Sequence, residues 1–384
     1  MKNIKKINDE YKGSFLKSFL FSVIIVSFFF IILELLLRIS GLVKVKVLGF
    51  PDIKTYKEIV GIFNPNQDFV NIDTLKSKLP YHVHINSHGL RGKEFNLKKD
   101  PNTLRILCLG DSYTFSNYVD DEETYPSQLE KFLARGWGVK GKKIEVINAG
   151  VSGYTIIDEL SYLQEKGIRV SPDLVIVGFV MNDVSDLTRK KGSWESQKET
   201  IEYWSSSPIG ALREKLVNTA IYNLLREVKA YVKYITKTDK TIAEAPLFNI
   251  VTENYDEKLL KLWGKYEESL VKMIDYLNSR DIKLVLVIFP IDYQVRMGWS
   301  DHPQRFLKEM GEKLGIEVCD LLPRFKQEAK NGIPLFFTPY DGHPTKHGYN
   351  IAAWETYKFL IEKRLINDSK NYNNIKKSNK QQTY

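Results

Sequence analysis

Two short blocks of this 384-residue sequence carry side chains that can perform nucleophilic chemistry. The first is the Gly-Asp-Ser sequence that ends at Ser112 and directly follows the apolar run 104–109. A serine at the exit of a buried strand is held by rigid backbone and can present its hydroxyl to a crevice. The second is the Asp-Gly-His-Pro sequence that contains Asp341 and His343. Such a pair can supply a general base and the carboxylate that orients it, so the two blocks predict a serine nucleophile activated by histidine.

From residue 104 onward, apolar runs typical of strands alternate with segments of helical spacing. The predicted strands are 104–109, 143–148, 174–180, 282–289 and 316–319, and the predicted helices are 125–133, 156–166, 260–278, 306–313 and 347–363. Apolar runs separated by helices indicate strands that are buried on both faces. We therefore predict an α/β fold in which helices cover both sides of a parallel sheet.

The chemistry-bearing residues share one position relative to this sheet. Ser112 follows the first predicted strand, the segment 148–153 follows the second, and Asn182 with Asp183 follows the third. Ligands of open parallel sheets bind beyond the carboxyl ends of the strands. Each motif alone is weak evidence for an active site, and their common location at the carboxyl ends of the strands is stronger evidence.

These blocks, in this order, resemble those of the SGNH (GDSL) hydrolase family. The serine block ends at Ser112, the glycine block Asn-Ala-Gly-Val-Ser-Gly ends at Gly153, and the asparagine block contains Asn182. Val180 stands where that block usually has glycine, and the final Asp-x-His spacing is one residue shorter than the frequent Asp-x-x-His. The shorter form is similar to that of envelope acyltransferase and esterase branches. The resemblance covers about residues 86–359 and implies a flavodoxin-like three-layer sandwich, the SGNH hydrolase fold.

The resemblance also implies the role of each residue. His343 would accept the proton of Ser112 as the hydroxyl attacks an ester carbonyl, and Asp341 would orient the imidazole. The oxyanion would be bound by the backbone N–H groups of Ser112 and Gly153 and by the side-chain amide of Asn182. No metal and no cofactor is required.

Other histidines offer alternatives to this assignment. His347 is a rival base four residues after His343, whereas His302 precedes a proline but has no aligned partner in the family. His82 and His84 have strand spacing, and a metal site with His88 is conceivable. We favour a structural edge strand, since no Cys, Asp or Glu lies beside these histidines.

An apolar segment near the amino terminus has the length of a membrane span. Residues 18–33 carry no charge, and 19–37 carry one. The segment could be a buried helix, a cleaved signal peptide or an uncleaved signal anchor. The first alanine of the chain is Ala134, so no Ala-x-Ala cleavage site exists, and a Phe-rich run that is apolar on all sides is unlike a soluble helix. We expect an anchor at 18–38, a cytoplasmic tail at 1–17 and an extracytoplasmic catalytic domain.

The remaining segments complete the expected organisation. A lead-in at 39–100 precedes the hydrolase domain at 101–366. Within the lead-in, the sequence 86–92 resembles that of membrane-anchored members of the family. An insertion at about 185–258 contains a predicted helix at 209–235, which either covers the sheet or forms a substrate-shaping or membrane-facing element. The polar tail 367–384 is expected to be disordered. Cys108 and Cys319 lie in apolar runs and are expected to be buried free thiols.

The formal charge of +9 could suggest a nucleic-acid-binding protein. The sequence contains no basic helix, zinc-ligand spacing or aromatic-basic sheet motif that would support such binding, so a solvated basic surface is the simpler explanation. The leading hypothesis is an anchored serine esterase or O-acyltransferase acting on acyl, most simply acetyl, esters of envelope glycans or glycolipids. A transferase would need an acyl donor brought across the membrane, and therefore a polytopic partner. The alternatives are a lipid esterase at the membrane surface and a catalytically inactive glycan-binding module.

Overall fold

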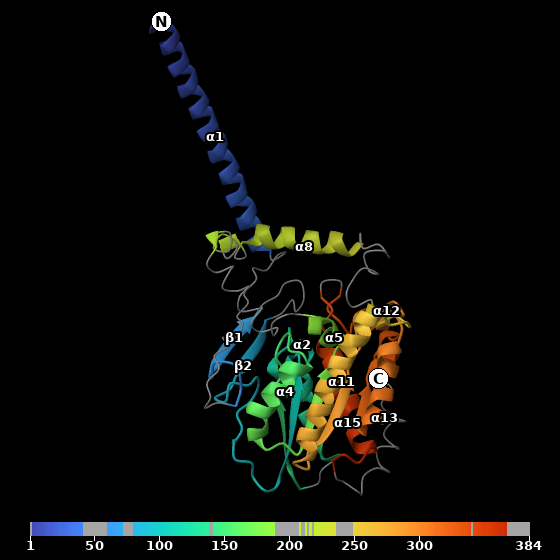
Figure 1. Cartoon of the computed structure of the whole chain (residues 1–384). Helices are drawn as coiled ribbons and strands as arrows, with labels where there is room; N and C mark the ends of the chain where they lie inside the picture. The colour runs from blue at the N-terminus through green and yellow to red at the C-terminus, as the bar shows by residue number, and fades with distance from the viewer. Residues whose placement is uncertain are drawn as a thin grey trace.

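The central feature of the fold is a five-stranded parallel sheet (Figure 1). The computed structural model describes residues 2–40, 60–71, 80–137, 141–188, 207–208, 212, 215–216, 219–235, 249–338 and 341–366. The sheet contains β3 (Thr103–Gly110), β4 (Lys143–Asn148), β5 (Leu174–Phe179), β6 (Lys283–Ile288) and β7 (Glu317–Asp320), in the order β4-β3-β5-β6-β7. This is the flavodoxin-like order, with β3 and β5 buried along their whole length. The predicted α/β sandwich is confirmed.

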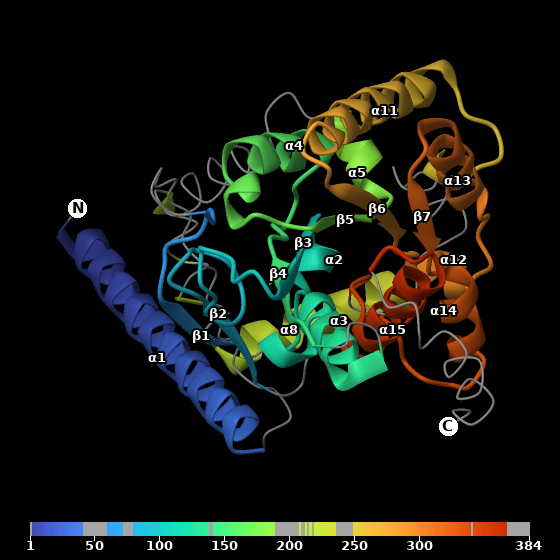
Figure 2. The ribbon, with the colours of Figure 1, turned by 90° about the horizontal axis from the view of Figure 1, so that it is seen from below.

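Helices cover both faces of the sheet (Figure 2). One layer contains α4 (Ile156–Glu165) and α11 (Glu257–Asn278), and the other contains α3 (Tyr125–Phe132) and α15 (Lys346–Glu362). Three further helices, which complete the β6 and β7 side, are α12 (Asp292–Arg296), α13 (His302–Leu314) and α14 (Leu322–Ala329). The short helices α2 (Ser112–Phe115) and α5 (Asn182–Ser185) begin directly beyond the carboxyl ends of β3 and β5.

A small antiparallel pair is attached to the edge of this sheet. β1 (Gln67–Asn71) pairs with β2 (Tyr81–Ile85), and single bridges link Ile85 to Arg91 and Arg91 to Asn148 at the end of β4. His82 and His84 lie on the outward face of β2, and the ring of His84 pairs with Asp68 at 2.6 Å. The predicted edge strand is therefore present.

The amino-terminal segment is one long helix, α1 (Lys2–Ser40), which extends away from the α/β body (Figure 1). Its residues Lys17–Ser40 have a mean hydropathy of 2.9 in their most apolar window, and none of that window is buried by the protein. Length and composition make this segment a candidate membrane span, and a signal sequence has the same features.

The helix predicted at 209–235 is wrong in its extent. The chain bends at Thr219, and α8 covers only Ala220–Ile235. The hydroxyl of Thr219 accepts the Tyr222 N–H at 3.3 Å, which explains why a new helix begins there. The tail 367–384 lies outside the described residues, as do large parts of the segments 39–100 and 185–258.

Candidate active site

Ser112 lies at a sharp turn between β3 and α2. Gly110 has φ of +147°, and a Cβ atom there would approach Thr114 Oγ1 to 2.1 Å, so this turn requires glycine. Asp111 caps α2, because its Oδ1 accepts the Tyr113 N–H at 2.9 Å. Ser112 is the first residue of the helix and remains half-buried. The turn thereby holds the hydroxyl at the edge of the sheet.

Asp341 and His343 come from a short loop before α15 that closes over this turn. His343 Nε2 lies 2.7 Å from Ser112 Oγ, and His343 Nδ1 contacts Asp341 Oδ1. Asp341 Oδ1 also accepts the backbone N–H of His343 at 2.9 Å. The Phe337 N–H donates to the His343 carbonyl at 3.0 Å, so the loop is also fixed by its own backbone. With the Nδ1 proton directed to Asp341, Nε2 is free to accept the serine proton.

Tyr113 connects the nucleophile turn to the histidine loop. Its hydroxyl donates to the Gly342 carbonyl at 2.7 Å, and its ring lies 5.1 Å from that of His343 between centroids. Burial raises the pKa of Tyr113, and the nearby Asp111 and Asp341 carboxylates raise it further. The phenol therefore keeps its proton and donates. Sequence reasoning missed Tyr113, although it directly follows Ser112 in the chain.

Three donors predicted for the oxyanion lie around Ser112. The Val151 N–H donates to the Gly110 carbonyl at 3.0 Å, which holds the turn containing Gly153 beside the nucleophile turn, and Gly153 has φ of +83°. Asn182 Nδ2 donates to Asp111 Oδ2 at 2.9 Å, which leaves its second N–H for a ligand. Within the described residues, no protein acceptor is recorded for the Ser112 and Gly153 N–H groups. These groups are therefore available to bind an oxygen anion.

Val180, which departs from the family pattern, is compatible with the turn before α5. Its N–H donates to Asp183 Oδ2 at 2.9 Å, and the Asp183 N–H donates back to the Val180 carbonyl at 2.9 Å. Val180 is buried and has a negative φ, so the turn imposes no need for glycine at this residue.

A pair of carboxyl groups is buried behind the site. Glu159 of α4 and Asp183 of α5 are both 2% exposed or less, and neither Glu159 oxygen has a hydrogen-bond partner in the described part of the chain. Burial raises the pKa of both groups, and the Asp111 carboxylate raises both pKa values further. Sequence reasoning assigned no role to Glu159, because a glutamate within a helix gives no sign that its side chain is buried.

Arg91 supports the segment that follows α2. Its guanidinium pairs with Asp121 at 2.7 Å and donates to the carbonyls of Phe115, Ser116 and Val119 at 2.7–2.9 Å. The same segment contains Tyr118, whose φ of +69° is rare for a bulky residue and whose ring lies 5.4 Å from that of His343. The arginine thus holds a strained backbone beside the imidazole of His343. Its place within the sequence 86–92 was the only signal of this role.

The other candidate histidines have different surroundings. His347 is exposed in the first turn of α15, and no contact of it with Ser112 or Asp341 is recorded among the described residues. His302 lies at the start of α13, where Nδ1 contacts the Thr252 carbonyl at 2.6 Å and the ring stacks on Tyr255. His88 Nε2 contacts the Phe95 carbonyl at 2.8 Å.

No cluster of metal-ligand type occurs among His, Cys, Asp and Glu side chains in the described residues. Cys108 and Cys319 are both buried and free, as expected, and burial raises the pKa of each thiol. These thiols stay protonated and are poor nucleophiles. The arrangement that can do chemistry is therefore the serine with its histidine, carboxylate and oxyanion donors, and its natural reaction is acyl transfer through an acyl-serine.

Comparison with known proteins agrees with this chemistry. Residues 108–351 match the sequence model of the GDSL-like lipase/acylhydrolase family, a range that runs from Cys108 in β3 into α15 and contains Ser112, Gly153, Asn182, Asp341 and His343. No curated protein matches the chain.

Three solved structures are similar to this chain at low sequence identity. A putative lipolytic protein of the G-D-S-L family from Desulfitobacterium hafniense is 14% identical, with 67% of this chain and 99% of that chain covered and a TM-score of 0.36. A lipase/acylhydrolase from Enterococcus faecalis is 17% identical, with 68% of this chain and 96% of that chain covered and a TM-score of 0.38. A catalytic mutant of an acetylxylan esterase from Geobacillus stearothermophilus is 18% identical, with 67% of this chain and 94% of that chain covered and a TM-score of 0.39.

Proposed function

Because this chain belongs to the GDSL-like lipase/acylhydrolase family, we propose that it is a membrane-anchored, extracytoplasmic serine esterase or O-acyltransferase. Its substrates are acyl esters, most simply acetyl esters, of envelope glycans or glycolipids. The observation that carries the enzymatic part is the chain of contacts from Asp341 through His343 to Ser112, with 2.7 Å between Nε2 and Oγ.

The first half-reaction forms the acyl-serine. Ser112 Oγ attacks the ester carbonyl carbon while His343 Nε2 accepts the hydroxyl proton, and Asp341 stabilises the resulting imidazolium. The tetrahedral oxyanion is bound by the N–H groups of Ser112 and Gly153 and by the free amide N–H of Asn182. The intermediate collapses as the C–O bond to the alcohol breaks, and His343 gives its proton to the departing oxygen.

The second half-reaction decides between hydrolysis and transfer. His343 removes a proton from the incoming hydroxyl, whose oxygen attacks the acyl carbon. The bond between the acyl carbon and Ser112 Oγ then breaks, and His343 gives the proton to Ser112 Oγ. Water as the nucleophile gives a carboxylic acid, and a sugar hydroxyl gives a new ester. For transfer, the acyl group must reach the extracytoplasmic face, so a polytopic membrane protein is the expected partner.

The surroundings of Ser112 support a carbohydrate ester as the substrate. The ring of Tyr118 meets those of Phe337 and His343 edge to face, with centroids 5.8 and 5.4 Å apart, and Tyr118 and Phe337 are half-buried. Partly accessible aromatic side chains beside the nucleophile can contact the apolar side of a sugar ring. On the Gly153 side, Ser152 Oγ donates to Asn117 Oδ1 at 3.3 Å, and both residues are half-buried. Aromatic surface combined with partly accessible polar groups suits a glycan better than a long alkyl chain.

The anchor part of the proposal rests on α1. Most apolar side chains of the span Lys17–Ser40 are exposed, and none of its most apolar window is buried by the protein. Such a surface is favourable in lipid but costly in water, unless the segment is cleaved off as a signal peptide. Lysines before the span favour a cytoplasmic amino terminus, which leaves the hydrolase domain on the other side of the membrane.

A lipid esterase is the second candidate, because the catalytic edge of the sheet lies on the side from which α1 departs. Figure 1 shows α2 and α5, which follow the carboxyl ends of β3 and β5, on that side of the body. An enzyme so placed could also act on acyl groups of membrane lipids.

Acyl release by the full chain in detergent tests the proposal and separates these substrates. We expect acetate release from an acetylated oligosaccharide, faster than fatty-acid release from a phospholipid with long acyl chains. Ser112→Ala should reduce turnover by a factor on the order of 10⁶. A repeat with unacetylated oligosaccharide and a small acetyl donor distinguishes transfer from hydrolysis. Retention of a tenth of the activity by Ser112→Ala would refute the assigned nucleophile, and exclusive phospholipid turnover would favour the lipid esterase.

A further inference from the structure

The helix α8 has an exposed apolar face that no part of the catalytic mechanism uses. Outside α1, nine large apolar side chains are exposed among the described residues, and five of them belong to 212–232: Leu212, Leu216, Leu225, Val228 and Val232. Leu225, Val228 and Val232 are spaced i, i+3 and i+7, so they form one stripe along α8, and they are 63%, 51% and 45% exposed. Ala220 and Asn223, which are buried, lie on the opposite side of the helix. A concentrated apolar stripe of this kind indicates an interaction surface.

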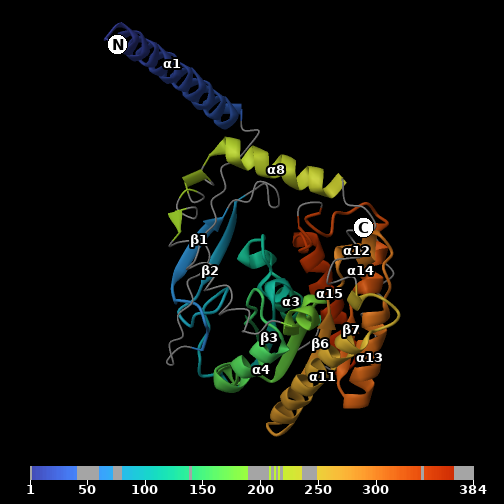
Figure 3. The same ribbon diagram turned by 45° about the horizontal axis from the view of Figure 1, so that its top comes forward.

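The position of α8 identifies what this surface contacts. Figures 1 and 3 both show α8 running crosswise at the end of α1, between that helix and the α/β body. The end of α1 is the end of the apolar span, and a helix that crosses it there lies at the level of a membrane surface if α1 is inserted.

A specific contact joins the two helices. The Glu34 carboxylate of α1 accepts the N–H groups of Ala220 and Ile221 at 2.8 and 2.9 Å, and it also pairs with Arg38 at 2.7 Å. A carboxylate at the amino terminus of a helix accepts hydrogen bonds from the unpaired N–H groups there and interacts favourably with the helix dipole. This contact therefore fixes the start of α8 to the end of the span.

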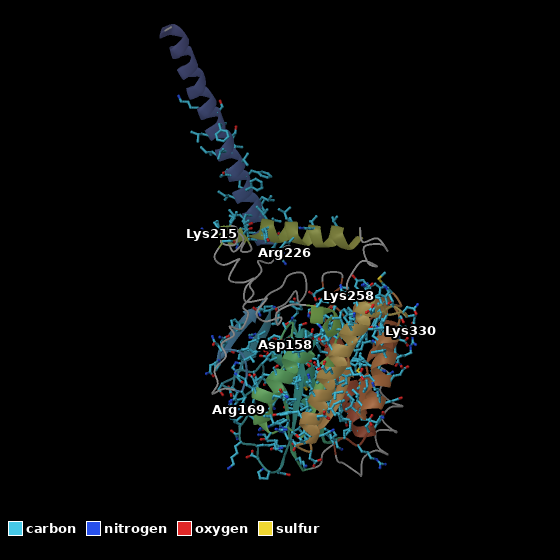
Figure 4. All side chains as sticks on the ribbon, in the orientation of Figure 1. Asp158, Arg169, Lys215, Arg226, Lys258 and Lys330 are labelled. Carbon is cyan, nitrogen blue, oxygen red and sulfur yellow. The ribbon has the colours of Figure 1, made fainter. Side chains whose placement is uncertain are left out.

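Basic residues accompany the apolar stripe. Lys215 and Lys229 are exposed, and Arg226 is half-buried. Figure 4 labels Arg226 on α8 and Lys215 just before that helix. Cations beside an exposed apolar stripe are the pattern of helices that lie in the headgroup layer of anionic bilayers.

We propose that α8 is an interfacial helix that inserts its Leu225–Val228–Val232 stripe into the lipid surface beside α1. This rests on the anchoring part of the proposed function and deepens it, because a second attachment would restrict rotation of the body about α1. The catalytic edge of the sheet would then face the membrane, and the enzyme would act on acyl groups carried by membrane-tethered molecules rather than on distant polymer.

Fluorescent labels on the full-length protein test this arrangement in vesicles of phosphatidylcholine and phosphatidylglycerol. A polarity-sensitive label is attached to Val228→Cys in the stripe, to Phe29→Cys in the span or to Leu260→Cys, an exposed position of α11. Cys108 and Cys319 are buried, and the unsubstituted chain controls for their labelling. Lipids with a nitroxide near the headgroup then quench labels that lie at the surface.

We expect the Val228 label to be quenched several-fold more than the Leu260 label and to shift to shorter wavelength on membrane binding. Equal quenching at both sites, with the Phe29 label quenched by nitroxides deeper in the bilayer, would overturn the α8 proposal and leave the anchor intact. An unquenched Phe29 label would instead refute the anchor and the α8 proposal with it. A Val228 signal that depends on protein concentration and not on nitroxide would identify a second copy as the occupant and overturn lipid binding.

A charge variant provides an independent check on the lipid partner. Lys229→Glu should lower quenching of the Val228 label in vesicles that contain phosphatidylglycerol, whereas Lys258→Glu on α11, also an exposed lysine, should leave it unchanged. In Figure 4, Lys258 is labelled on the α/β body and not on α8. Equal effects of the two variants would contradict a surface that recognises anionic headgroups through α8.

Discussion

At the scale of single residues, the catalytic assignment depends on which histidine reaches Ser112. His343 Nε2 is 2.7 Å from Ser112 Oγ, and His347 is exposed in the first turn of α15. The two residues are four positions apart, so the sequence spacing leaves both open. The family resemblance favours His343, and the loop geometry, in which His343 also contacts Asp341, agrees with that choice.

We predict that His343→Ala abolishes acyl turnover and that His347→Ala retains it. Loss of the base removes proton transfer in both half-reactions, and removal of a triad histidine can lower kcat by a factor on the order of 10⁶. The measurement is kcat for release of a small acyl group by each variant, with equal folding checked by circular dichroism. An active His343→Ala enzyme beside an inactive His347→Ala enzyme would reverse the assignment.

Asn182 is predicted to act in the transition state. Its side chain donates to Asp111 at 2.9 Å and holds a second N–H for the oxyanion, so Asn182→Ala should lower kcat with little change in KM. One oxyanion donor contributes about 3 kcal/mol, or roughly 10²-fold in rate. Ser185→Ala on the same short helix is the matched control and should keep wild-type kcat. A raised KM with unchanged kcat would place Asn182 in substrate binding instead.

At the scale of elements, the active site depends on contacts between short helices and loops. Tyr113 of α2 holds the loop of Asp341 and His343 through Gly342, and Arg91 holds the segment after α2. Behind them, Glu159 of α4 and Asp183 of α5 bring two carboxyl groups into the same buried region. Because burial raises the pKa of both acids, we expect the packing of α4 and α5 to respond to pH.

We predict that stability falls as pH rises, partly through Glu159. In the unfolded chain a glutamate releases its proton near pH 4.3, but burial raises the pKa of Glu159 in the folded protein. Above that pH the folded state binds more protons than the unfolded state, so the free energy of unfolding decreases with pH up to the raised pKa. Between pH 5 and pH 8, the Glu159→Gln variant should therefore lose less thermal stability than the wild-type protein.

Thermal unfolding across this pH range measures the effect. Glu165→Gln, an exposed position of the same helix, is the control and should follow the wild-type curve. Parallel curves for wild type and Glu159→Gln would show that Glu159 is ionised in the folded protein or does not titrate in this range.

At the scale of the whole molecule, the proposed anchor α1 would determine where the enzyme works. Its apolar span and the crosswise α8 lie on the side of the body at which the parallel strands end (Figure 1). A domain attached on that side would meet substrates within a short distance of the membrane. Such an attachment would restrict the accessible substrates as much as the residues around Ser112 do.

We predict that the hydrolase domain lies outside the cytoplasm and stays attached through the span. Protease added to cells with a permeabilised outer layer should digest the domain and spare a short amino-terminal fragment. The reason is that lysines before the span retain the amino terminus on the cytoplasmic side. Protection of the domain until the cytoplasmic membrane is broken would contradict this topology, and a mature chain beginning near Gly41 would indicate a cleaved signal peptide.

The sequence by itself determined the α/β class, the strands and the set of candidate residues. These features are local: a continuous apolar run indicates a strand buried on both faces, and motifs that directly follow such runs must lie at the carboxyl edge of the sheet. The apolar span was likewise evident from composition alone.

The tertiary structure decided the contacts between segments that are distant in the chain. Tyr113 and Gly342 are 229 residues apart, and Glu34 and Ala220 are 186 apart, so no local pattern could pair them. The same holds for the buried state of Glu159 and for the start of α8 at Ala220, which the helical spacing of 209–235 had concealed. Apolar periodicity reports which face of an element is covered, whereas the identity of the covering group depends on how all the elements pack together.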